Sequence, residues 1–329
     1  MLATAFTDLV GCRVPIQLAG MGGVATPGLA AAVADAGGLG MVNMVMQPAR
    51  DVAVALDAMT SQTTGRVGLN ILMPFLDPEV VEVAASRLRV VEFFYADPDA
   101  ALVRRVHDGG ALAAWQVGSL TEARAAVEAG CDFIVAQGTE AGGHVRGQVS
   151  LLPLLDSVLD AVDIPVVAAG GIATARGVAA VLAAGASGVR LGTRFVATLE
   201  ANAHPLYIDA LLRASADDTV LTTAFSGMWP DAPHRVLRSC VEAAQGVTDD
   251  IVGEMSLGAT RIPVPKLSVP SPTRDATGAI AAMALYAGES VGAVTQLVSA
   301  GEVVRELAEG AERLLRAHCP EAAEDRPSR

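Results

Sequence analysis

The sequence predicts an α/β protein, a (β/α)8 TIM barrel with a smaller lobe inserted after the eighth strand. Short apolar runs alternate with Ala-rich amphipathic stretches from residue 14 to about 214, and eight of these runs have strand character. Glycine-rich turns follow the first, sixth, seventh and eighth runs. An open doubly wound sheet usually has fewer strands and carries its nucleotide signature after the first strand, so these observations favour the barrel.

Each expected strand is short and rich in Val, Ile, Leu or Ala, which is typical of parallel strands covered by helices. The strands are expected at residues 14–19, 39–43, 66–72, 90–95, 111–117, 133–137, 165–169 and 188–191. The first barrel helix should begin at Thr26-Pro27, because Thr can cap a helix and Pro suits its first turn. Further helices fit at 121–129 and 174–184, each followed by a glycine.

The pattern changes after a helix expected at 203–214. The stretch IPVPKLSVPSPTR contains Pro263, Pro265, Pro270 and Pro272, which forbid a long helix there. Helical patterning resumes at 276–286 and again near 303–317, and the polar tail 319–329 is expected to fray.

We therefore divide the chain into a barrel domain, residues 1–216 and 276–329, and an inserted substrate or lid lobe, residues 217–275. The C-terminal helices are expected to pack back on the barrel. They could equally bury their apolar faces against a second subunit, so a homodimer is an open option.

Composition excludes several classes of function. Hydrophobic residues make up 52% of the chain and charged residues 18%, which provides for a large core. A net charge of −13 without a run of Lys or Arg disfavours nucleic-acid and anionic-membrane partners. The four cysteines lie far apart, which indicates reduced thiols and neither disulfides nor zinc. With no signal peptide and no long apolar stretch recognised, we expect a cytoplasmic protein.

Two glycine-containing loops predict a phosphate site. They lie in IPVVAAGGIAT at 164–174 and SGVRLGTRF at 187–195, after the seventh and eighth strands. In barrels these two loops commonly bind phosphate through backbone N–H groups. Gly170, Gly171 and Gly192 would let a phosphate approach the backbone, and Thr193 can add a hydroxyl donor. Either loop alone could be an ordinary tight turn, but two in successive positions favour the phosphate site.

A histidine leaves the sixth strand toward the same mouth. In FIVAQGTEAGGH, Gly142 and Gly143 would let the backbone pass close to a flat ligand while His144 projects over it. An imidazole of near-neutral pKa suits proton abstraction there, although an isolated loop histidine more often bonds a carbonyl. Its position one loop before the phosphate loops favours His144 over three histidines expected to be structural or at the surface: His107, His204 and His234.

Other strand ends carry candidate ring contacts. The turn LAGMGG after the first strand is not GxGxxG and is weak evidence for a dinucleotide, but Met21 could pack on an isoalloxazine face beside Gly22. Asn70 ends the third strand and Gln116 the fifth, and each amide could bond a ring edge. A buried structural amide is an equally good explanation of both.

Taken together, AQGTEAGGH, PVVAAGGIA and GTRF, followed by EANAHP at 200–205, resemble the nitronate monooxygenase family, formerly the 2-nitropropane dioxygenases. The resemblance covers residues 14–214, and MALYAGESVG at 283–292 is similar to the family's C-terminal part. It implies FMN at the barrel mouth and identifies His144 with the active-site histidine. The implied FMN contacts are Met21, Gly22, Asn70, Gln116, Gln137, Gly142, Gly143, Gly170, Gly171, Gly192 and Thr193.

The resemblance also implies a reaction. A small nitronate, such as propionate-3-nitronate, would give its electrons to FMN and then to O2, leaving a carbonyl compound and nitrite. His144 would act as base where a neutral nitroalkane must lose its α-proton.

Alternatives stay open. FMN-dependent enoyl-acyl-carrier-protein reductases, which use NAD(P)H, share the same strings, and GLNILMPF at 68–75 is nearer to them. A flavin reductase or dehydrogenase of coenzyme A thioesters and a non-catalytic flavin-binding barrel are further options. The Pro-rich 263–272 and PHRVLR at 233–238 are more typical of monooxygenase-type members.

Overall fold

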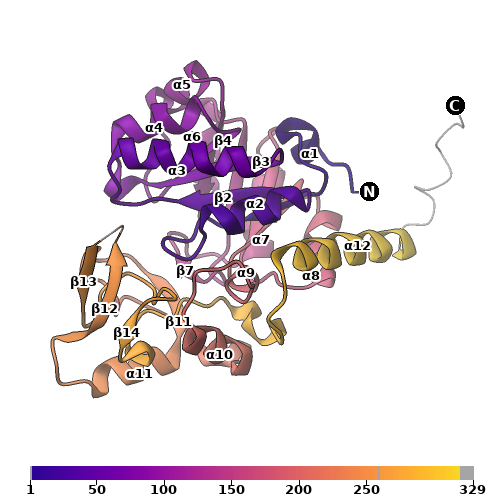
Figure 1. The fold of residues 1–329 in the computed structure, drawn as a ribbon. Coiled ribbons are helices and arrows are strands. Elements are labelled where there is room, and N and C mark those ends of the chain that lie inside the picture. The colour runs from indigo at the N-terminus through magenta and orange to yellow at the C-terminus, as the bar shows by residue number, and fades with distance from the viewer. Residues whose placement is uncertain (1, 258–259, 319–329) are drawn as a thin grey trace, which may run out of the picture.

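Eight parallel strands close into a barrel in the computed structural model, which describes residues 2–257 and 260–318 (Figure 1). The strands are β1 (Ile16–Leu18), β2 (Leu39–Asn43), β3 (Arg66–Leu72), β4 (Val90–Phe94), β5 (Leu112–Val117), β6 (Phe133–Gln137), β8 (Val166–Ala169) and β9 (Gly188–Leu191). Pairing of Ile16 with Val189 closes the barrel between β1 and β9. All eight predicted strands are confirmed in order, with ends that differ by two residues or fewer.

Helices cover the outside of the barrel. They are α2 (Pro27–Asp35), α3 (Ala49–Gln62), α4 (Pro78–Ala85), α5 (Ala100–Asp108), α6 (Leu120–Ala129), α7 (Leu151–Leu159) and α8 (Ala175–Ala183). The predicted caps are confirmed, since the Thr26 side chain accepts the N–H of Leu29 at 3.2 Å and Pro27 begins α2. Thr174 caps α8 in the same way by accepting the N–H of Gly177.

An apolar layer closes the barrel at the amino ends of the strands. Helix α1 (Ala5–Val10) places Phe6 and Val10 there, and the Phe6 ring meets Phe133 edge-on at 5.4 Å. Because side chains alternate along a strand, the next inward positions lie one layer nearer the mouth. That second layer is polar, and it is described with the site below.

The eighth position in the ring of helices belongs to α12 (Ala300–His318), which packs against α8 and α2 (Figure 1). Its buried face includes Val303, Val304 and Leu307, so this apolar surface is covered by the chain's own barrel. The expected packing of a C-terminal helix on the barrel is confirmed. The tail 319–329, for which fraying was predicted, lies outside the described residues.

Between β9 and α12 the chain forms α9 (Thr193–Val196), α10 (Pro205–Arg213), α11 (Arg238–Gly246) and the strands of two small sheets, except for one strand that comes from the segment after β6. One sheet has the order β10 (Thr219–Thr222), β11 (His234–Leu237), β7 (Gly143–His144), and the other β13 (Thr260–Pro265), β12 (Ile251–Leu257), β14 (Thr277–Gly278). The division of the chain at 216/217 and 275/276 stays a prediction.

The helix predicted over 276–286 is wrong. That segment contains β14, which pairs with β12, and a 3-10 turn at Ile280–Ala282. Gly278 has φ +104, and a Cβ there would lie 2.4 Å from the carbonyl oxygen of Val252. The apolar periodicity of the segment reflects its burial between other elements and not a helical face.

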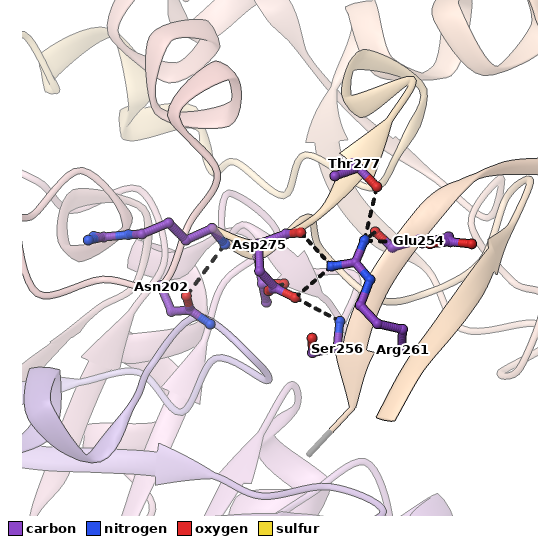
Figure 2. Close-up of polar contacts among 8 residues, drawn as sticks. Asn202, Glu254, Ser256, Arg261, Asp275 and Thr277 are labelled. Atoms are coloured by element: carbon purple, nitrogen blue, oxygen red, sulfur yellow. Dashed lines mark hydrogen bonds and ion pairs between the residues drawn. The ribbon is translucent and has the colours of Figure 1, made fainter. Parts of the chain in front are cut away.

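Asp275 ties the β12–β13 hairpin to the segment that returns toward the barrel (Figure 2). Its carboxylate accepts the backbone N–H of Ser256 at 2.9 Å and the guanidinium of Arg261 at 3.3 Å, and Arg261 also donates to Thr277 at 3.0 Å. Hydrogen bonds from Ser256, and also from Thr273, lower the pKa of Asp275 to about 2. The neighbouring N–H of Arg274 donates to the Asn202 side chain near the barrel end.

Candidate active site at the barrel mouth

Six polar side chains form a cluster inside the barrel, just below its mouth, which we call the interior polar cluster. Its members are Gln17, Asn43, Asn70, Glu92, Gln116 and Arg190. Glu92 is fully buried and accepts from Gln17 Nε2 at 3.1 Å and from Asn70 Nδ2 at 2.7 Å. Since β1 and β4 are not neighbours, the bond between Gln17 and Glu92 crosses the barrel interior.

A buried ion pair lies at the centre of this cluster. The Arg190 guanidinium donates to Glu92 and to the Gln116 side-chain oxygen. Burial lowers the pKa of Arg190 to about 9, which still leaves the guanidinium protonated at neutral pH. Charges removed from water in this way are tolerated only when they are paired and hydrogen-bonded.

Breaking this pair should destabilise the fold. We expect Glu92→Leu to lower the free energy of unfolding by about 3–5 kcal/mol, because it leaves the guanidinium of Arg190 buried without its counter-ion. Glu92→Leu combined with Arg190→Met should recover most of that loss. Urea unfolding of the flavin-free proteins measures both effects, and a double variant no more stable than Glu92→Leu alone would contradict the ion-pair explanation.

The predicted ring-edge amides belong to this cluster. The Asn70 amide donates to Glu92 and accepts from Asn43 Nδ2 at 3.0 Å, and Gln116 accepts from Arg190. The structural explanation of both therefore holds, and each amide retains a donor for a ligand above it. Sequence reasoning missed Glu92 and Arg190, although a charged residue inside an otherwise apolar strand was a usable signal.

The two glycine loops follow β8 and β9, which are neighbours in the barrel and pair through Ala169 and Arg190. Gly170 and Gly171 have φ values of +115 and +67, a conformation that side chains rarely adopt, and a Cβ on Gly171 would lie 3.2 Å from the Cβ of Glu140. A Cβ on Gly192 would lie 3.6 Å from the sulfur of Met21, so the loops after β1 and β9 are adjacent. A Cβ on Gly22 would lie 3.5 Å from the side-chain oxygen of Asn43.

Thr193 and the tight turn at Gly142 are both fixed by the C-terminal segment. The Thr193 hydroxyl accepts the N–H of Gly288 at 2.9 Å, which leaves its own proton available. A Cβ on Gly142 would lie 2.5 Å from the backbone nitrogen of Gly288, so glycine is required there for close packing. Only open space faces Gly143, which has φ +79.

His144 lies on β7, which pairs with β11 of the lobe. Gln137 at the end of β6 donates from Nε2 to the carbonyl oxygen of His144 at 3.0 Å. His144 is partly exposed, yet its Nε2 is buried and has no hydrogen-bond partner in the described part of the chain. The same is true of Gln137 Oε1, so two unpaired polar atoms lie at the mouth.

Aromatic rings surround the imidazole. Trp229 stacks on it with ring centroids 4.0 Å apart and planes 20° apart, and Tyr286, Tyr95 and His234 lie at 5.7, 6.0 and 5.2 Å. Burial, with a smaller contribution from His234, lowers the pKa of His144 to about 3. The imidazole is therefore neutral near pH 7, which is the form that accepts a proton.

The other histidines have structural positions, as expected. His234 is buried, accepts the N–H of Phe225 at Nε2 and contacts the carbonyl of Ala232 at 2.8 Å through Nδ1. His204 caps α10 by accepting the N–H of Leu206.

Sequence reasoning missed the aromatic neighbours of His144. Tyr95 follows β4 with φ +74, a rare conformation for a non-glycine residue that often marks a functional site. Trp229 lies on a loop and Phe75 ends a 3-10 turn at Met73–Phe75, and no periodicity points to either of them. The WP dipeptide at 229–230 signals only a turn.

A cavity of about 300 Å³ lies over the ends of β2 and β3. The cavity is lined by Asn43 and Asn70 of the interior polar cluster. It is also lined by Phe75, whose ring packs edge-on against Trp229. Its remaining walls are mainly apolar: Met44, Val45, Met46, Pro48, Leu69, Ile71, Leu72 and Val80, with Gln47 and Asp77. No basic residue lines it, so this cavity suits an uncharged apolar group.

These residues fit a flavin mononucleotide. Backbone glycines with Thr193 provide a cradle for the phosphate, the loop at Met21 provides an apolar contact for a ring, and Gln137 Oε1 offers an acceptor for a ring N–H. Within residues 2–257 and 260–318 no group of three His, Cys, Asp or Glu side chains could hold a metal ion. In the same ranges no helix has both the length and the hydropathy needed to cross a bilayer.

An eight-stranded barrel with a glycine cradle and a histidine at its mouth whose Nε2 is buried is typical of the class of barrel-type flavin oxidoreductases. The family model described as nitronate monooxygenase matches residues 3–81 and 76–310, and the chain belongs to this family.

Two kinds of curated relative match. A (3aS,4S,5R,7aS)-5-hydroxy-7a-methyl-1-oxo-octahydro-1H-indene-4-carboxyl-CoA dehydrogenase of Mycobacterium tuberculosis is 38% identical over 243 residues, 72% of this chain and 67% of the relative. A probable nitronate monooxygenase of Staphylococcus aureus is 30% identical over 297 residues, 76% of this chain and 79% of the relative.

Two solved structures are also similar to this chain. FabK from Thermotoga maritima matches with a TM-score of 0.79 and 29% identity over 98% of this chain and all of FabK. A nitroalkane oxidase from Streptomyces ansochromogenes matches with a TM-score of 0.75 and 30% identity over 94% of this chain and all of that chain.

Proposed function

We propose that this protein is an FMN-dependent nitronate monooxygenase that oxidises small alkyl nitronates with O2 to a carbonyl compound and nitrite. The observation that carries the proposal is the buried, neutral and unpaired Nε2 of His144 beside the glycine cradle. Family membership and the similarity to a nitroalkane oxidase support it.

FMN at the mouth would supply the two-electron chemistry and the reaction with O2, held by Gly170, Gly171, Gly192 and Thr193. For a neutral nitroalkane, Nε2 of His144 would take the α-proton. The resulting imidazolium would be stabilised by the adjacent nitronate anion, because a nearby opposite charge favours the charged form of the imidazole. For a preformed nitronate the same residue would help to position the anion.

A second candidate is an oxidoreductase of acyl thioesters, linked to coenzyme A or to an acyl carrier protein. The 38% identical relative is named as a carboxyl-CoA dehydrogenase, and FabK matches over the full chain. The apolar 300 Å³ cavity beside the mouth could hold an acyl group. In that case His144 would serve as the proton donor or acceptor at the carbon next to the thioester.

An anaerobic flavin-reduction assay separates the two candidates. The FMN-loaded protein is mixed with propionate-3-nitronate, NADH, NADPH or a series of acyl-CoA thioesters, and the flavin absorbance is followed. We expect rapid bleaching by the nitronate alone, and nitrite after O2 is admitted. Free FMN is the control for non-enzymatic reduction. Rapid bleaching by NAD(P)H or by an acyl-CoA, with none by the nitronate, would reject nitronate oxidation.

A further inference from the structure

Trp229 reaches from the lobe to the histidine at the barrel mouth. It lies on the loop between β10 and β11, and only 6% of its surface is exposed. Its ring stacks on His144 at 4.0 Å, and it is itself held edge-on by Tyr95 at 4.5 Å and by Phe75 at 5.4 Å. The indole therefore has a fixed orientation, because barrel residues pack on it while it covers the imidazole.

Hydrogen bonding does not fix the protonation of His144, since Nε2 has no partner in the ranges described. Among the residues that the structure describes, three titratable groups lie beside the imidazole, one from each surrounding element: His234 on β11, Tyr286 in the C-terminal segment and Tyr95 after β4.

The nearby cations already have anionic partners. Arg146 lies 5.9 Å from the Tyr95 ring centroid and is paired with Glu122 and Asp97. Arg235, the neighbour of His234, is paired with Glu289 at 3.1 Å. Exclusion of water is thus the main influence on the pKa of His144. Among the rings around the imidazole, Trp229 lies closest to it.

We propose that Trp229 is a positioning residue that shields His144 from water and so keeps it available as a base in acidic solution. The inference rests on the proposed role of His144 as the base. Without the indole, water would reach the ring and stabilise the imidazolium, so the histidine would become protonated below about pH 6.5, as in a peptide.

The direct test is the titration of His144 in the FMN-loaded protein. With ¹³C-labelled histidine, the five imidazole signals are followed by NMR from pH 8 to pH 5, and the His144 signal is assigned by its loss in His144→Ala. In the wild type it should not titrate in this range, since the pKa of His144 is lowered to about 3. In Trp229→Ala the signal should titrate within this range, with a midpoint near the peptide value of about 6.5.

Two variants separate shielding from simple loss of packing. Trp229→Phe, which can still stack, should restore a His144 signal that does not titrate, while Trp229→Gln, which fills part of the same space but brings a polar group and water to the imidazole, should titrate. Met228→Ala, on the same loop but with Met228 45% exposed, should behave as the wild type.

The pH dependence of kcat/KM for a neutral nitroalkane gives a second measurement. Trp229→Ala should acquire an acid limb that falls about tenfold per pH unit below the new pKa, while the wild type stays flat to pH 5. A His144 signal that fails to titrate in both Trp229→Ala and Trp229→Gln would overturn the proposal. If His144 titrates as expected but neither the wild type nor any variant turns over nitro compounds, the proposed function is rejected. The shielding of His144 by Trp229 would still hold in that case.

Discussion

His144→Ala should retain bound FMN and oxidise a preformed nitronate at a substantial rate, yet lose about 10²- to 10⁴-fold in kcat/KM for the parent nitroalkane. The α-proton of the nitroalkane needs a neutral base, and Nε2 of His144 is buried, unpaired and unprotonated near pH 7. The nitronate has already lost that proton. Steady-state rates with nitroethane and with ethylnitronate, compared at one pH, measure the difference.

A matched histidine variant serves as the control. His204→Ala removes the cap of α10, which should lower stability by about 1 kcal/mol without a selective effect on either substrate. Equal losses on nitroethane and ethylnitronate in His144→Ala would assign His144 to binding and not to proton transfer. An unchanged rate on both would remove it from the mechanism.

Gly171→Val should abolish FMN binding, with affinity weakened at least about 100-fold, a loss of roughly 3 kcal/mol. Its φ of +67 strains any branched side chain, and its Cβ would lie 3.2 Å from that of Glu140 in the loop after β6. The added methyl groups would therefore occupy the space between the two loops that a phosphate needs. Titration of the flavin-free protein with FMN, followed by flavin fluorescence, gives the affinity.

Backbone strain alone has its own control. Gly110 has φ +88 with open space around it and lies between α5 and β5, at the end of the barrel opposite the mouth. Gly110→Val should lose stability and keep its affinity for FMN. Normal FMN affinity in Gly171→Val would move the phosphate site to another part of the mouth.

The barrel could be predicted because its signals are local. Strand length, β-branched content and a capping Thr or a closing glycine repeat with every unit, so the strands were placed to within two residues. The segment 276–286 could not be predicted in the same way. Its apolar spacing mimics a helix, while its conformation follows from the pairing of Thr277 and Gly278 with β12, a strand more than 20 residues earlier.

The residues of the candidate site also differ in whether local sequence signals or long-range contacts determine their positions. The glycine loops stand immediately after strands and His144 lies in the segment between β6 and α7, so position in the barrel already implies the mouth. Trp229 contacts His144 although it lies 85 positions later in the sequence, and its loop has no regular pattern. The pairing of Glu92 with Arg190 across the barrel is similarly a long-range property, although each residue alone is conspicuous in its strand.

The strand β7 has a consequence for protein engineering. Gly143 and His144 pair with Arg235 and His234 of β11, and the N–H of Val145 donates to the carbonyl of Pro233. The backbone that carries the histidine is thus an edge strand of the lobe sheet as well as a barrel loop. A chimera that takes its lobe from a relative acting on another substrate must therefore transplant residues 142–146 together with that lobe. An exchange limited to the contiguous insertion would leave the histidine in a mismatched sheet register.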